Sequence, residues 1–134
     1  MNAPYIISNN PAVYAKYGES AHGELSLSKQ EGYLQVLLAA RNAIHQGHHL
    51  LMHPESGSVK PYQTPYRSLL LEVNDTLDMD SLLMIEQAIA RFQGFIEMRA
   101  IPQQHHYSQE TLQDFQTIDL SLVTQGFVQT MEKT

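Results

Sequence analysis

Short apolar runs alternate with helical patterns along this chain, and the alternation is the feature that most constrains its fold. The runs at 5–8, 22–27, 48–52 and 67–73 predict strands, because each is brief, contains alternating or continuous apolar residues and is bounded by turn residues. Strands that alternate with helices indicate an open sheet covered by helices. The expected fold is a single α/β domain over 1–134, with an open, mainly parallel, Rossmann-like sheet of four strands and helices on both faces.

Four helices are expected from capping residues and from apolar residues that recur at steps of three and four. Their expected extents are from Pro11 to a stop at Gly18, residues 31–46, from Asp78 or Asp80 toward Pro102, and from Ser108 to a break near Gly126. Ser28 and Glu31 fit a capping box ahead of the second helix. In the last helix the expected inward residues are Leu112, Phe115, Ile118 and Leu122.

The connection at 53–66 has no helical pattern, since prolines at 54, 61 and 65 rule out a continuous helix. Loops of this length are often functional. Two routes into the strand at 67–73 remain open, a wide hairpin and an extended crossover. That strand is accordingly either antiparallel or parallel to its neighbour.

Composition excludes several function classes. A net charge of −6 argues against a nucleic-acid partner, and the absence of cysteine removes disulfides and thiol chemistry. No apolar run approaches the roughly 20 residues that a membrane span requires. The expectation is a cytoplasmic protein with no nucleic-acid or membrane partner and with a homo-oligomeric state left open. Acidity is concentrated in residues 69–134, which carry ten acidic and three basic side chains.

Ligands of open α/β sheets bind beyond the carboxyl ends of the strands, where two segments of this chain qualify. The Asn9-Asn10 turn opens a helix, and the 53–66 loop supplies small, hydroxyl-bearing and basic residues. Backbone amides, hydroxyls and an ammonium group suit a phosphate or a carboxylate. The predicted ligand-binding residues are Asn9, Asn10, His53, Ser56, Gly57, Ser58, Lys60, Thr64 and Tyr66.

Simpler interpretations stand beside this one. Ser56-Gly57-Ser58 also fits a plain tight turn with Lys60 in solvent, and nucleotide-binding glycine motifs are absent. His53 is suited to acid/base chemistry, which would make the protein a small enzyme, but the sequence identifies no catalytic set. The histidines at 45, 48, 49 and 53 are crowded, yet adjacent strand residues point to opposite faces, so no metal site is predicted. No particular cofactor is indicated.

Several segments resemble the GrdX family. They are Ser8-Asn9-Asn10-Pro11, residues 33–52, the stretch His53-Pro54-Glu55-Ser56-Gly57-Ser58-Val59-Lys60-Pro61, Thr64-Pro65-Tyr66, residues 77–83 and residues 114–119. Glu55, Tyr62 and Gln63 depart from the pattern. Proteins of this family are encoded beside components of glycine, sarcosine and betaine reductases. The resemblance implies an accessory protein of such amino-acid metabolism and carries over no established activity.

Two function hypotheses follow. The first is an accessory protein that binds a small anionic metabolite, namely phosphate, acyl phosphate or a carboxylate, at the Asn9-Asn10 turn and the 53–66 loop. The alternative is an assembly protein that docks a reductase subunit through its acidic C-terminal half.

Overall fold

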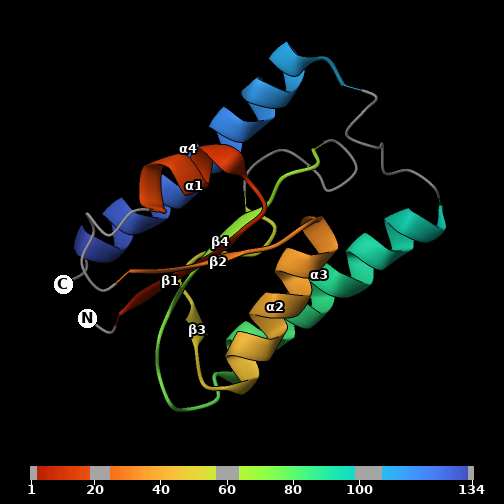
Figure 1. Cartoon of the computed structure of the whole chain (residues 1–134). Helices are drawn as coiled ribbons and strands as arrows, with labels where there is room; N and C mark the ends of the chain where they lie inside the picture. Colours follow the sequence, from red (N-terminus) through yellow and green to blue (C-terminus); the bar gives the residue numbers. More distant parts are fainter. Residues whose placement is uncertain (1–2, 19–24, 57–63, 99–106, 133–134) are drawn as a thin grey trace.

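The computed structural model describes residues 3–18, 25–56, 64–98 and 107–132. Four strands and four helices lie in these ranges: β1 (Pro4–Ser8), α1 (Pro11–Tyr17), β2 (Ser26–Lys29), α2 (Tyr33–His45), β3 (His49–Leu50), β4 (Ser68–Glu72), α3 (Met79–Glu97) and α4 (Gln109–Glu132). The predicted alternation of strands and helices is confirmed (Figure 1).

The sheet is mixed, which corrects the mainly parallel, Rossmann-like prediction. In the described part of the chain its order is β2-β1-β4-β3, and only the β1–β2 pair is parallel. Strand β4 is antiparallel to β1 and to β3. Of the two predicted routes into this strand, the wide hairpin is therefore correct and the extended crossover is wrong. The proline-rich connection fits this arrangement, because a parallel neighbour is usually joined through a crossover helix, which the prolines disfavour.

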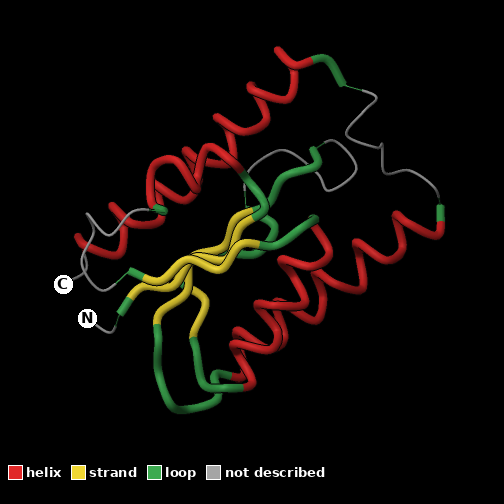
Figure 2. The backbone as a smooth tube through the Cα atoms, in the orientation of Figure 1, coloured by secondary structure: helices red, strands yellow, loops and turns green. Residues whose placement is uncertain are grey.

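Helices cover both faces of the sheet, as predicted (Figure 2). On one face, α2 and α3 pack against Ile7, Leu69 and Leu71, and on the other, α1 and α4 pack against Ile6 and Leu70. Successive strand residues point to opposite faces, so the three consecutive leucines of β4 contribute to both cores.

Several local predictions need correction. The strand predicted at 22–27 is found at Ser26–Lys29, and residues 22–24 lie outside the described residues. The predicted capping box is wrong, because Ser28 lies in β2, where it pairs with β1, and α2 begins after Gly32 without a side-chain cap. The strand predicted at 48–52 is reduced to His49–Leu50. Helix α4 continues through Gly126, where a Cβ would lie 3.4 Å from the Leu70 side chain. This glycine allows close packing of α4 on the sheet and does not end the helix.

Candidate functional site

The Asn9-Asn10 turn and the end of the 53–66 loop meet at one edge of the sheet. Strands β1, β2 and β3 run in one direction; β1 and β2 end at this edge, beside the start of β4, whereas β3 ends earlier, with Leu50 opposite Leu71. The Asn9 amide donates to the Pro65 carbonyl at 2.8 Å, and the Arg67 backbone N–H donates to Asn9 Oδ1 at 2.9 Å. The two predicted segments are therefore in direct contact.

Asn10 is fully buried and fixes the start of α1. Its Oδ1 accepts from the Ala12 N–H at 2.9 Å, which caps the helix. Its Nδ2 donates to the Gln116 carbonyl at 2.9 Å and to Asp119 Oδ2 at 3.0 Å. Like Asn9, it uses its carboxamide to hold protein groups, so the two asparagines shape this edge of the sheet.

Asp119 joins α4 to the sheet through a buried network that the sequence interpretation missed. Its carboxylate, in a side chain only 4% exposed, accepts from the Ser68 N–H at 2.9 Å and from the Ser68 hydroxyl at 2.6 Å. Since the Ser68 proton is directed to Asp119, Ser8 donates to Ser68 Oγ at 2.6 Å. The predicted inward residue Ile118 is 42% exposed instead. The pattern that could have identified the inward face of α4 is the recurrence, at steps of three and four, of Gln116, Asp119, Leu120, Val123 and Phe127.

The described part of the 53–66 loop is tied down at its end. Thr64 and Tyr66 are buried; Thr64 Oγ1 accepts from the Tyr66 N–H at 3.2 Å, and Gln116 Nε2 donates to the Tyr66 hydroxyl at 2.9 Å. His53 is exposed, and its Nδ1 accepts from the Glu55 N–H at 3.0 Å. The predicted residues Gly57, Ser58 and Lys60 lie outside the described residues.

Arg67, which the sequence interpretation placed in a strand, is a buried cation beside this loop. It is 2% exposed; its Nε donates to the Tyr33 hydroxyl at 3.2 Å and its Nη1 to the Ser56 carbonyl at 3.0 Å. Burial raises the pKa of the Tyr33 hydroxyl, and the positive charge of Arg67 offsets part of the increase. Within the described ranges, no carboxylate lies within ion-pair distance of the guanidinium.

Two cavities adjoin these residues, and Leu122 of α4 lines both. The smaller, of about 10 Å³, has room for a single water molecule and is lined by residues that include Arg67 and Asp119. The larger, of about 290 Å³, is lined by Met52, His53, Ser56, Leu122, Gln125, Gly126 and Gln129. The buried Ser56 hydroxyl has no hydrogen-bond partner among the described residues. Among the described residues, a hydroxyl with no hydrogen-bond partner therefore lies next to a guanidinium that has no ion-pair partner and lies 5.6 Å from the centre of the Tyr33 ring.

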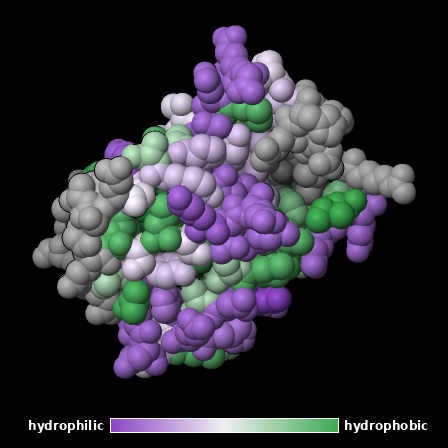
Figure 3. All heavy atoms as spheres, viewed as in Figure 1, coloured by the Kyte–Doolittle hydropathy of each residue, from purple (hydrophilic) through white to green (hydrophobic). Residues whose placement is uncertain are grey.

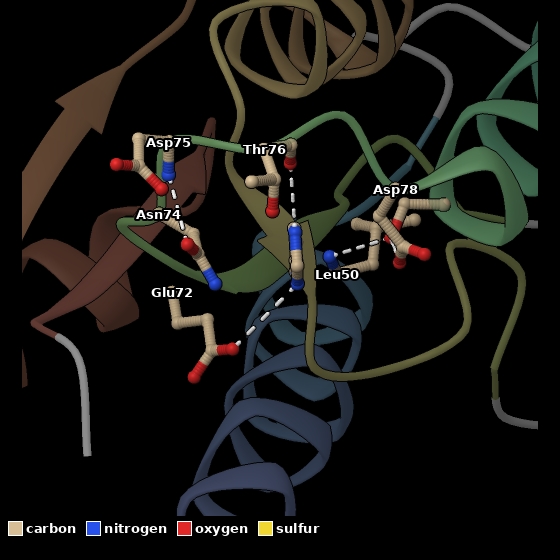
Figure 4. Close-up of polar contacts among 8 residues, drawn as sticks. Leu50, Glu72, Asn74, Asp75, Thr76 and Asp78 are labelled. Atoms are coloured by element: carbon tan, nitrogen blue, oxygen red, sulfur yellow. Dashed lines mark hydrogen bonds and ion pairs between the residues drawn. The ribbon is translucent and has the colours of Figure 1, made fainter.

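The histidines at the start of β3 take part in local contacts, and Figure 4 shows polar contacts around this end of the strand, with Leu50, Glu72 and Thr76 labelled. His49 Nε2 lies 2.9 Å from the Thr76 carbonyl, and its Nδ1 is 3.8 Å from Glu72. The His48 ring meets Tyr5 edge to face, and burial, together with the charge of His49, lowers the pKa of His48. In the described ranges, no three His, Cys, Asp or Glu side chains form a group that could hold a metal ion.

Comparison with known proteins gives one result. The family model for GrdX, described as GrdX-like protein, matches residues 5–128. No curated protein and no solved structure matches the chain. None of the helices in the described ranges is long and apolar enough to cross a membrane.

Proposed function

The chain belongs to the GrdX-like family, and on that premise we propose that it is an accessory protein that binds a small anion for a glycine reductase-related system. The membership suggests the association with such systems. The anion, a phosphate, an acyl phosphate or a carboxylate, binds where the Asn9-Asn10 turn meets the 53–66 loop. Asn9 and Asn10 shape the site, Ser56 contacts the ligand, and the buried Arg67 supplies positive charge behind Ser56.

The observation that carries this proposal is the buried guanidinium of Arg67. Charged side chains are almost never fully buried unless they are paired, because desolvation of an unpaired charge is costly. Asp119 lines the same small cavity, but its oxygens are engaged by Ser68 and Asn10. Residues 57–63, which follow Ser56, contain no acidic side chain and one lysine. An external anion would supply the missing negative charge.

Ser56 supports the same site from a second direction. Its buried hydroxyl has no partner among the described residues, and such a group costs about 1–3 kcal/mol unless something satisfies it. Its carbonyl already accepts from Arg67, so its hydroxyl and the guanidinium are held close together. A phosphate or carboxylate oxygen accepts hydrogen bonds from both kinds of donor. Lys60, in the same loop, is proposed to add a second positive charge.

The test is a thermal-shift titration with phosphate, acetyl phosphate and acetate at constant ionic strength. A ligand at ten times its dissociation constant stabilises the native state by about 1.4 kcal/mol, so the melting temperature rises by several degrees. Ser56→Ala and Lys60→Ala reduce the shift, whereas Ser26→Ala, at an exposed serine of β2, leaves it unchanged. No shift with any anion would refute the proposal and favour the alternative, docking through the acidic C-terminal half.

A further inference from the structure

We infer that the ligand is larger than a bare anion and that its uncharged, hydrogen-bonding body occupies the cavity of about 290 Å³ beside Ser56. This inference rests on the proposed function, because the anionic end is taken to bind at Ser56, next to the buried charge of Arg67. It adds the class of ligand: a small metabolite that joins a phosphate or carboxylate to a neutral polar body.

The cavity lies between one face of α4 and the segment that follows β3. Leu122, Gln125, Gly126 and Gln129 are spaced by three and four residues, so they share that face of the helix. The facing wall consists of Met52, His53 and Ser56. Both walls lie on the α4 side of the sheet, where Met52 packs with the core of that face. The cavity is therefore formed by elements that the packing of the domain already positions.

The lining favours a neutral polar molecule. Gln125 and Gln129 are exposed carboxamides, and each can donate and accept hydrogen bonds. Met52 and Leu122 supply apolar surface, and no lysine, arginine, aspartate or glutamate is among the lining residues in the described ranges. A second charge on the ligand would have no partner there, whereas amide, hydroxyl or carbonyl groups would find partners.

The volume sets the size of that body. A cavity of about 290 Å³ corresponds to roughly ten water molecules at the density of the liquid, well beyond what inorganic phosphate fills. This volume is also close to the lower end of the volumes found for small-molecule binding pockets. The anionic end is placed by Ser56, which lines the cavity and accepts from Arg67 through its carbonyl. The ligand therefore extends from Ser56 along the glutamine face of α4.

The experiment compares bare and extended anions by calorimetric titration of the full chain. Inorganic phosphate is paired with glycerol 3-phosphate, and acetate with N-acetylalanine, so each head group is tested with and without a neutral polar body. Within the head-group class that binds, the extended compound is expected to bind at least tenfold more tightly. Which pair binds distinguishes a phosphate ligand from a carboxylate ligand.

Variants of α4 assign the difference to the cavity. Gln125→Ala and Gln129→Ala are each expected to weaken the binding of the extended compound by about threefold to tenfold, which corresponds to one hydrogen bond. The affinity for the bare anion should not change. Gln113→Ala, an exposed glutamine of α4 that does not line the cavity, is the matched control.

Failure of this inference is distinguishable from failure of the proposed function. Equal affinity for bare and extended anions, reduced by Ser56→Ala but not by the glutamine variants, would overturn the inference and leave the proposed function standing. Absence of binding by all four compounds would overturn both. Binding that depends on the glutamines but not on Ser56 would overturn the anion site and keep the cavity as a site for neutral ligands.

Discussion

Replacing Asp119 by alanine tests how α4 is held on the sheet. The variant leaves the buried Ser68 N–H without its acceptor, removes the partner of the Ser68 hydroxyl and takes away one of the two acceptors of the Asn10 amide, which keeps the Gln116 carbonyl. Hydrogen bonds to a charged group contribute about 1.5–3 kcal/mol each, but members of one network are not additive. Leaving buried donors of this network unsatisfied costs about 1–3 kcal/mol each, so the expected loss is a large fraction of a total stability of about 5–15 kcal/mol.

The assay is urea unfolding followed by circular dichroism, with Asp114→Ala as the control. Asp114 is exposed on the same helix, so its replacement is expected to change the unfolding free energy by no more than about 0.5 kcal/mol. Asp119→Asn should also destabilise, because an amide replaces an acceptor that faces donors from Ser68 and Asn10. A loss below about 1 kcal/mol in Asp119→Ala would show that the network does not hold the helix.

Three further outcomes are expected. Gly47→Ala should lower the unfolding free energy by about 2 kcal/mol or more, because Gly47 has φ +106° and a Cβ would lie 2.8 Å from the Asn74 carbonyl oxygen; unchanged urea unfolding would contradict this. Gly94→Ala should raise the unfolding free energy by roughly 0.5–1 kcal/mol in the same assay, because this glycine lies inside α3 and its Cβ would meet no atom within 4 Å; a lower unfolding free energy would contradict this. His48 has a lowered pKa, so the unfolded chain binds its proton more readily and stability falls as pH drops below about 6.5; His48→Gln should flatten that dependence between pH 7 and 5, and an identical slope would refute the assignment.

On the surface, hydrophilic residues predominate on the face shown in Figure 3, and hydrophobic residues form separate patches there. Among the described residues, the large exposed apolar side chains occur on α3 and directly after it, on α4 and in the β4–α3 connection, for example Met79, Met98 and Val128. Single exposed apolar side chains are ordinary on protein surfaces. They do not by themselves identify a docking surface for the acidic half of the chain.

The alternation of strands and helices could be predicted from the sequence because periodicity is a local property. The helix predicted at 31–46 corresponds closely to α2. Asn10 caps the start of α1, as its residue type suggests. Strand direction could not be predicted, because it depends on which neighbour β4 pairs with across the sheet. The pairing of Ile7 with Leu69 is a tertiary contact between distant segments, and the local sequence pattern holds no information about it.

The candidate site shows the same division. Loop position and turn chemistry brought Asn9, Thr64 and Tyr66 into consideration, and the structure places them at one edge of the sheet. Arg67 and Asp119 were missed as site residues, since a charge inside an apolar pattern is usually assigned to solvent. Their burial follows from hydrogen bonds between segments far apart in the sequence, such as Arg67 with Tyr33.

The most direct test of the anion site is to observe the Arg67 guanidinium itself. In ¹⁵N-labelled protein, the Nε–Hε signal absent from the Arg67→Lys spectrum identifies Arg67, and phosphate, acetyl phosphate or acetate is then titrated at constant ionic strength. The account predicts a saturable shift of this signal with at least one anion, weakened in Ser56→Ala, while the signal of the surface residue Arg41 stays unchanged. An Arg67 signal that none of these anions moves would contradict the account.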